Sequence, residues 1–545
     1  MLAKVRSLTA SHNMAIQNIC SRNTGLVIDV IENDFIGELL PSVVDSSQKL
    51  LYPYTRPEFL YFSDEEVTLS ADQSARPVLC PKDPLKMPAY TGYAEVINAG
   101  KTVQNEDQAS ARILTLVQQG CNAEEARDLT IYDHRSDSDS VSRSSSKVCE
   151  HLTENVRAAR RYSNADMIVP PNSNSSIKKP MEAAFFAIFD GHAGSGAAIM
   201  AANCLHKHIR HRLCQVLERI TFLSNSNTFC GCSTQSSADI TEEYNSSSFD
   251  YSITSDSLVV GAIETAFKDM DDQIAEEKQL WRICGGSTAI ASLFFLGKLF
   301  IANAGDCRAL LITTDNIQQL SQDFTPATER KRLQFIAYKN PDLISKYFSR
   351  YEYSRFLTRN DLRRKVFYRD WFMDGWATKT VRESDLKMPM ISAHDKKRRL
   401  LNTIGVSRGF GDHSLFTADG KIPIKPFLSP VPEVKIFDLK KIDPLSDEDV
   451  LVLASDGLWD VLSNNDVTAI VKTALKNSDP TDYLKYTIAA QEVAVAARGN
   501  PIETYRWQMS SGGCASTDDI TVFIIPLKYA FAPLISRTGN NEGIQ

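Results

Sequence analysis

Five short acidic motifs recur along the 545-residue sequence, each beside an apolar run typical of a strand. They are Glu106-Asp107, Asp190-Gly191, Gly305-Asp306, Asp456-Gly457 with Asp460, and Asp518-Asp519. Strand ends place side chains at the edge of a sheet, where gathered carboxylates repel one another unless a cation lies between them. Carboxylate oxygens favour Mg²⁺ or Mn²⁺ over zinc, and the histidines show no metal-ligand spacing. The sequence therefore predicts that these carboxylates, Asp190 among them, gather around divalent metal.

The strength of this prediction lies in the combination of motifs. Asp-Gly is a common turn dipeptide, so a single pair would be weak evidence for a metal site. Five acidic motifs in order, all flanked by strand-like runs, form a far more specific pattern.

Strands and helices around the motifs must position them. Apolar runs predict helices at 195–220 and 257–277, and strands at 93–99, 111–120, 183–189, 450–454 and 518–527, with a hairpin at 287–313 that turns near Leu296-Gly297-Lys298. Because strands and helices do not strictly alternate, the pattern predicts an α+β fold with antiparallel sheets and helices packed outside them.

The chain reads as one large domain with additions. We expect an extension at 1–50, a domain at 51–530 and a tail at 531–545. Serine-rich segments at about 121–180 and 222–256 are too polar to bury a core, which predicts surface loops inserted into the domain. Residues 330–399 carry 19 Lys or Arg and 8 Asp or Glu, together with several aromatic residues. This block predicts a basic helical subdomain at about 321–400 that meets an acidic partner; a solvated face is the alternative.

Bulk composition excludes several classes of protein. The net charge is -7, with 60 basic and 67 acidic residues, which gives no global reason to expect nucleic-acid binding. The eleven cysteines form no CxxC pair and read as reduced, intracellular thiols. The sequence shows neither a secretory leader nor an apolar run of about 20 residues, so we expect no transmembrane segment. A cytoplasmic protein is expected, with the nucleus or a membrane periphery as alternatives.

Six segments together resemble the metal-dependent type 2C Ser/Thr protein phosphatases, the PPM family. They are GKTVQNEDQA, FFAIFDGHAGSGAA, GGSTAIASLFFLGKLFIANAGDCRALL, IGVSRGFGDH, VLVLASDGLWDVLSNNDV and STDDITVFIIPL, and they span about Tyr93 to Leu527. The resemblance implies a sandwich of two stacked antiparallel β-sheets flanked by helices. It also implies an inserted subdomain, the flap, at about 321–400, which includes the basic block. It also implies hydrolysis of phosphoserine and phosphothreonine on proteins.

The resemblance assigns metal ligands at matching positions. Asp190 would bridge two Mg²⁺ or Mn²⁺ ions, and the Gly191 carbonyl would hold the first. Asp456 and Asp518 would hold the second. The remaining acidic residues would act at the rim or through waters (Glu106, Asp107) or at a weaker third ion (Asp306, Asp460). Two cations about 3.5–4 Å apart lower the pKa of a bridging water, and the resulting hydroxide can attack phosphorus in line.

Other positions match groups that act on the substrate. His192 matches the family histidine proposed as the general acid for the leaving oxygen; a turn histidine bonded to a carboxylate is the alternative reading. Many members place an arginine before the Glu-Asp pair to hold the substrate phosphate. Here Lys101 is the nearest cation, and a lysine cannot make the bidentate contact of arginine. Arg408 and Asp412 would position the site.

The segments RPEFLYFSDEEV, YRDWFMDGWATKT and IKPFLSPVPEV resemble the subgroup of H, J and M members. This narrower resemblance implies phosphorylated Rab-type GTPases as candidate substrates and allows a homodimer. Three rival functions are a scaffold that has lost catalysis, a nucleic-acid or acidic-lipid binder acting through 330–399, and a hydrolase of small phosphate esters. The scaffold is disfavoured because Asp190, Asp456 and Asp518 are all present.

Overall fold

The computed structural model describes residues 52–70, 72, 74–97, 104–118, 180–226, 253–344, 347–392, 397–418, 421–503 and 506–531. By its contacts the chain divides into Met1–Thr115 with Glu182–Gln545, and Leu116–Met181. Nearly all described residues belong to the first unit. The expected extension at 1–50, most of both serine-rich segments, the tail and Lys101 lie outside the described residues.

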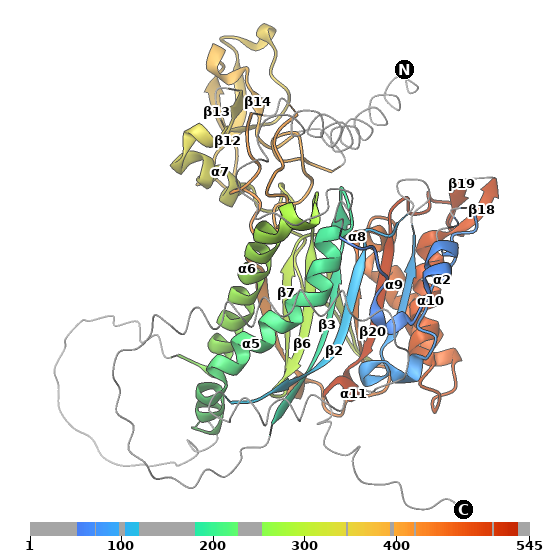
Figure 1. Cartoon of the computed structure of the whole chain (residues 1–545). Coiled ribbons are helices and arrows are strands. Elements are labelled where there is room, and N and C mark those ends of the chain that lie inside the picture. The colour runs from blue at the N-terminus through green and yellow to red at the C-terminus, as the bar shows by residue number, and fades with distance from the viewer. Residues whose placement is uncertain are drawn as a thin grey trace, which may run out of the picture. The chain divides into compact units, whose positions relative to one another are not determined.

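Two five-stranded sheets form the centre of the first unit (Figure 1). The first has the order β1 (Gly92–Val96), β20 (Ile520–Pro526), β17 (Val450–Ala454), β8 (Arg308–Ile312) and β9 (Ile317–Gln319), with antiparallel pairing throughout. The second has the order β16 (Glu433–Asp438), β7 (Lys298–Ala304), β6 (Ala289–Phe295), β3 (Met181–Phe189) and β2 (Gln108–Leu116), antiparallel from β16 to β3. The predicted α+β class with antiparallel sheets is confirmed.

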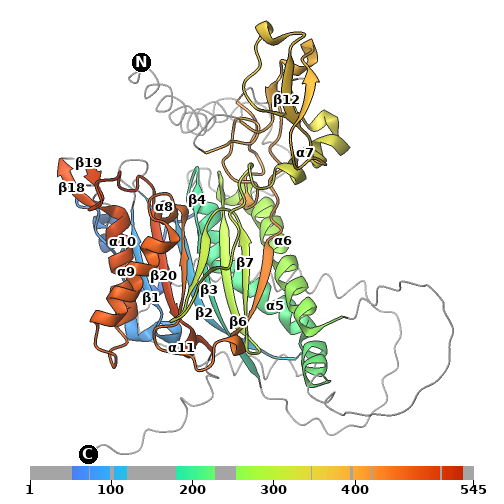
Figure 2. The same ribbon diagram turned by 180° about the vertical axis from the view of Figure 1, so that it is seen from behind.

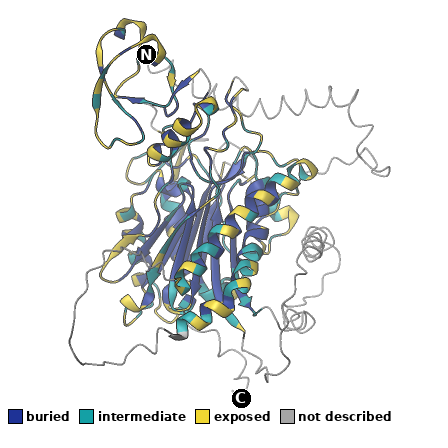
Figure 3. Ribbon diagram, turned by 90° about the vertical axis from the view of Figure 1, so that its left-hand side faces the viewer, coloured by how far each residue is buried: buried dark blue, intermediate teal, exposed yellow. Residues whose placement is uncertain are grey.

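Alternation along the strands explains how the sheets stack. In β17, Leu451 and Leu453 belong to the core between the sheets, while Val450 and Val452 face the opposite side. Successive side chains of a strand point to opposite faces, so each strand serves two apolar layers. Figure 3 shows the inner strands of the two sheets buried and the helices exposed along their outer faces. The runs are therefore apolar without interruption because both faces of each sheet are covered.

Helices cover both outer faces, as predicted (Figures 1 and 2). The paired α9 (Asn464–Asn477) and α10 (Lys485–Arg498) pack on the first sheet through residues such as Val471 and Tyr486. Two long helices, α5 (Gly196–Ser226) and α6 (Ser255–Trp281), cover the second sheet. Thr254 begins α6 with a capping box, in which its side chain accepts from the Ser257 N–H. None of the helices in the described residues combines the length and apolar composition needed to cross a membrane.

The basic block is built differently from the expectation. Its one α-helix is α7 (Arg330–Lys339) within the described residues, so the prediction of a helical insertion is wrong. The rest comprises a three-stranded sheet, a short parallel pair and three short 3-10 helices. The sheet is β11 (Glu352–Tyr353), β12 (Lys365–Arg369) and β13 (Ala377–Thr380), the pair is β10 (Phe348–Ser349) and β14 (Met388–Pro389), and the 3-10 helices are η4 (Pro341–Ile344), η5 (Arg359–Asp361) and η6 (Glu383–Asp385). Hydrophobic spacing was a poor guide because its apolar cluster is small and joins distant residues such as Leu333, Met390 and Phe427.

Shorter elements complete the described structure. They are α2 (Asp64–Leu69), α8 (Asp456–Trp459), α11 (Leu527–Phe531), the 3-10 helices η1 (Glu58–Leu60), η2 (Pro84–Lys86), η3 (Pro88–Tyr90) and η7 (Leu439–Lys441), the hairpin of β18 (Asn500–Glu503) and β19 (Arg506–Gln508), and a small sheet of β15 (Phe410–Gly411), β5 (Gly286–Ser287) and β4 (Gly191–His192).

Candidate active site

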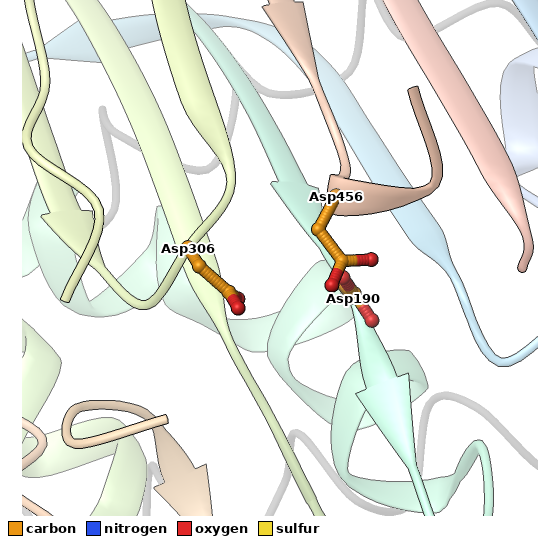
Figure 4. A group of neighbouring side chains, drawn as sticks. All are labelled: Asp190, Asp306 and Asp456. Atoms are coloured by element: carbon orange, nitrogen blue, oxygen red, sulfur yellow. The ribbon is translucent and has the colours of Figure 1, made fainter. Parts of the chain in front are cut away.

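Three of the predicted carboxylates converge at one end of the two sheets. Asp190 follows β3, Asp306 precedes β8, and Asp456 begins α8 directly after β17. One carboxylate oxygen from each residue lies within 4.8 Å of the others. Figure 4 shows the three side chains pointing toward a common space. The sheets thus deliver three acidic groups from distant parts of the sequence to one point.

Strand register explains why Asp306 and Asp456 meet. In the antiparallel pair of β17 and β8, Ala454 lies opposite Arg308. Asp456 stands two residues after Ala454, and Asp306 stands two residues before Arg308. Both chains therefore leave the sheet at the same edge and side by side. Asp190 joins them from the second sheet, where its carbonyl accepts a hydrogen bond from the Thr288 N–H (2.8 Å).

The glycines that follow Asp190 and Asp456 are required by close backbone approaches. A Cβ on Gly191 would lie 2.4 Å from the Glu106 carbonyl oxygen, and a Cβ on Gly457 would lie 1.8 Å from the Asp519 carbonyl oxygen. No side chain fits at such distances, so only glycine allows these segments to meet. The two Asp-Gly motifs are thus pinned against the other two acidic motifs, Glu106-Asp107 and Asp518-Asp519.

Crowding of negative groups dominates the electrostatics of the site. Burial raises the pKa of Asp190 well above its usual range, and Asp456, Asp107, Asp306 and Asp518 raise it further. Burial and then Asp456 likewise raise the pKa of Asp306. Such a cluster stays ionised only when a cation compensates it. The donor set, three converging carboxylates with hard oxygens, fits a divalent Mg²⁺ or Mn²⁺ ion.

The Glu106-Asp107 and Asp518-Asp519 motifs are cross-linked beside this cluster. The Glu106 N–H donates to Asp519 Oδ2 (2.8 Å), and the Glu106 carboxylate accepts from the Gly194 N–H (2.7 Å). Burial and then Asp519 raise the pKa of Asp107, whose Oδ2 is buried without a hydrogen-bond partner among the described residues. That unpaired oxygen is a second observation that fits a bound cation or its water.

Asp460 lies at the outer side of the cluster and is paired with a lysine. Lys397 Nζ lies 2.6 Å from Asp456 Oδ2 and 2.7 Å from Asp460 Oδ2. Burial lowers the pKa of Lys397, but Asp456 and Asp306 outweigh it and hold the pKa above its usual value. The structure therefore places a protein cation where the sequence had suggested a third metal ion. An open groove lined by Arg308, Trp459 and neighbouring residues begins at Asp460.

His192 lies two residues beyond Asp190, at the edge of the cluster, and is held by a carboxylate. Its Nε2 lies 2.7 Å from Asp412 Oδ2. Burial lowers the pKa of His192, whereas Asp412 raises it, and the net pKa is raised. The Asp412 N–H donates to the Gly285 carbonyl (2.8 Å), so β4, β5 and β15 fix both residues together. The imidazole is therefore favoured in its charged, proton-donating form.

A buried carboxylate supports this arrangement from α6. Asp271 Oδ1 accepts from the Gly411 N–H (2.8 Å) and lies 3.1 Å from His413 Nε2, while its Oδ2 accepts from Lys425 Nζ (2.5 Å). Sequence reasoning missed Asp271 because nothing local distinguishes it within an amphipathic helix. It missed the roles of Asp519 and Lys397 for a similar reason, since their partners lie far away in sequence. Arg408, for which a structural role was expected, pairs with Glu329 (2.7 Å).

Comparison with known proteins agrees with this geometry. The family model described as "Protein phosphatase 2C" matches residues 150–335 and 385–500. Human "Protein phosphatase 1H" is 40% identical over 516 residues, covering 88% of this chain and 92% of that protein. Rat "Protein phosphatase 1J" is 36% identical over 482 residues, covering 87% and 86%. The family model skips 336–384, which includes most of the basic block.

Solved structures are more distant. A serine-threonine phosphatase 2C from Toxoplasma gondii is 19% identical, with a TM-score of 0.32, and covers 63% of this chain and 84% of its own. The identity to curated relatives over most of the chain, together with the family match, settles the classification. The chain belongs to the protein phosphatase 2C family and is a metal-dependent protein serine/threonine phosphatase.

Proposed function

We propose that this phosphatase hydrolyses phosphoserine and phosphothreonine on proteins at a dinuclear Mg²⁺ or Mn²⁺ site centred on Asp190. One observation carries the proposal: the carboxylates of Asp190, Asp306 and Asp456 converge within 4.8 Å of one another. Buried like charges at this distance require compensation, and divalent cations provide it with the preferred ligand type.

The ligand roles are those that the family resemblance implies. Asp190 would bridge the two ions, the Gly191 carbonyl would hold the first, and Asp456 and Asp518 would hold the second. Further contacts at the rim, through waters, or at a third ion would come from Glu106, Asp107, Asp306 and Asp460. Bound cations would lower the pKa of a water and offset negative charge on the phosphoryl oxygens. Lys101, which lies outside the described residues, would contact the substrate phosphate.

His192 would give its proton to the serine or threonine oxygen as the phosphate ester breaks. An alkoxide is a poor leaving group, so protonation at this oxygen lowers the barrier. Asp412 would keep the imidazole oriented and charged through its 2.7 Å contact. In this account Asp412 is a positioning residue, because it acts through His192.

Asp412→Asn is expected to lower turnover of a phosphothreonine peptide roughly 10–100-fold, as loss of an orienting partner commonly does. An asparagine keeps the shape but removes the charge that favours imidazolium. Turnover of p-nitrophenyl phosphate, whose leaving group needs no proton, should change by no more than about threefold. Steady-state rates on both substrates check this. Equal losses on both would show that Asp412 merely holds the fold.

The flap is proposed to bring the phosphoprotein to the site. Several of its basic groups are already paired within it, as Arg350 is with Asp370, Arg369 with Glu352 and Lys379 with Asp385. This internal pairing weakens the reading of residues 330–399 as a nucleic-acid surface. Exposed basic side chains remain at Arg363, Arg364 and Lys365 where β12 begins. Rab-type GTPases are candidate substrates through the subgroup resemblance, which also suggests a homodimer. A cytoplasmic location is proposed from the pattern of cysteines.

Reversing these three charges (Arg363→Glu, Arg364→Glu and Lys365→Glu together) is expected to raise the KM for a phosphoprotein substrate several-fold. The three residues lie on the surface, so the change alters electrostatic attraction and leaves the metal site intact. Turnover of p-nitrophenyl phosphate should stay the same. Steady-state kinetics on both substrates test this prediction. An unchanged KM for the phosphoprotein would show that these three residues do not bind the substrate and form a solvated surface.

The activity itself is tested by phosphate release from a phosphothreonine peptide with Mg²⁺ or Mn²⁺, and with a chelator. A competition between this peptide and a small phosphate ester then separates a protein phosphatase from a small-ester hydrolase. The account expects the peptide to be the preferred substrate by kcat/KM.

A further inference from the structure

Lys397 reaches from the end of the basic block into the acidic cluster. Its Nζ contacts Asp456 Oδ2 at 2.6 Å and Asp460 Oδ2 at 2.7 Å, so one ammonium bridges two carboxylates. The lysine side chain is 51% exposed, whereas that of Asp456 is 17% exposed. The contact thus joins a solvent-accessible lysine to one well-covered carboxylate, Asp456, and one exposed carboxylate, Asp460.

Asp456 is also one of the three residues whose oxygens converge on the candidate metal position. A Mg²⁺ ion requires oxygen ligands at about 2.0–2.1 Å, which places it in direct competition with an ammonium on the same carboxylate. A divalent ion and a lysine cation on one carboxylate would also repel each other strongly at such distances. Metal binding at Asp456 and Asp460 is therefore weaker while Lys397 contacts them, and it strengthens when Lys397 moves away.

The backbone that carries Lys397 is anchored to the flap. The next residue, Arg398, donates to Glu352 Oε1 in β11 (2.6 Å). The Arg399 N–H donates to Ser392 Oγ (2.8 Å), and Leu400 is fully buried in an apolar cluster that contains flap residues such as Leu333 and Met390 and also residues 404–428. Because these contacts fix residues 398–400 to the flap, the reach of Lys397 depends on where the flap lies.

We propose that Lys397 is a tethered cation that competes with divalent metal at Asp456 and Asp460, so that it sets metal affinity there and couples the flap to metal loading. This inference rests on the proposed dinuclear site and extends it. It differs from a third metal ion because the compensating charge belongs to the protein. Anything that pulls the flap segment away, such as a substrate bound to the flap, would then favour loading of the outer carboxylates.

Titration of the metal-free, full-length protein with Mn²⁺, followed by calorimetry and by the EPR signal of free Mn²⁺, tests the proposal without any activity readout. Lys397→Met removes the charge and keeps the aliphatic stem. The dissociation constant of the weakest resolved Mn²⁺ site is expected to fall roughly tenfold in this variant. An effect of this size is expected when one unit charge is removed from a position a few ångströms from a divalent ion. Lys387→Met, a flap lysine with the same change of charge, is the matched control and should titrate like the wild type.

A second comparison tests the proposal in the background of the Asp460→Asn substitution. With Asp460→Asn in place, Lys397 loses one of its two partners, so Lys397→Met should tighten Mn²⁺ binding less than it does in the wild type. Unchanged or weaker binding in Lys397→Met would overturn the competition. Absence of Mn²⁺ binding in the wild type and all variants would instead remove the dinuclear site itself, which makes the two failures distinguishable.

Discussion

Asp190→Asn is expected to lower metal-dependent hydrolysis of a phosphothreonine peptide by at least about 10³-fold. Asp190 stands at the centre of the cluster, and an asparagine removes the charge that would bridge two cations. Loss of several kcal/mol of transition-state stabilisation corresponds to this factor. Phosphate release in saturating Mg²⁺ or Mn²⁺ measures the rate, and Mn²⁺ calorimetry should show fewer ions bound per chain.

The matched control is Asp315→Asn, which removes the same charge from an exposed turn between β8 and β9. This variant should bind Mn²⁺ and turn over the peptide like the wild type. Full activity in Asp190→Asn would contradict the assignment of the bridging ligand. Loss of activity in both variants would show that the activity depends on the net charge of the protein and not on the position of Asp190 in the carboxylate cluster.

His192→Ala is the second large effect. Turnover of a phosphothreonine peptide is expected to fall roughly 10²–10⁴-fold, the usual contribution of a general acid. The peptide releases a basic alkoxide that needs a proton, whereas nitrophenolate leaves without one. Steady-state rates for the peptide and p-nitrophenyl phosphate should therefore separate by at least about tenfold in this variant.

His211→Ala provides the control, since His211 lies on the exposed side of α5 and contacts Gln215. It should leave both rates unchanged. Equal losses on the two substrates in His192→Ala would remove the general-acid role and leave the alternative reading, a turn histidine bonded to the Asp412 carboxylate.

Much of the site could be predicted because its signals are local. Asp190-Gly191 and Asp456-Gly457 each close an uninterrupted apolar strand, and a strand end fixes where the next side chain lies. The glycines have a physical cause, since backbone oxygens of Glu106 and Asp519 lie where a Cβ would stand. The hairpin of β6 and β7 was equally readable, because two apolar runs flank a glycine, and Gly297 does adopt a positive φ in the turn.

The remainder depends on contacts between residues far apart in sequence. The partner of His192 is Asp412, 220 residues away, and Asp456 meets Lys397 across 59 residues. No spacing rule pairs such residues before the fold is known. The flap was misread as helical because its short strands pair at Glu352–Arg369 and Tyr353–Tyr368 without a long alternating pattern. The contact between Asp460 and Lys397 likewise joins residues 63 positions apart and could not be seen in the sequence.

The most direct test of the central claim measures phosphate release from a phosphothreonine peptide by the wild-type chain after complete chelation, and again after stepwise return of Mn²⁺ or Mg²⁺. The account predicts negligible release without metal and recovery that follows metal occupancy of the carboxylate cluster. Release that persists at the full rate in the chelated protein would contradict it.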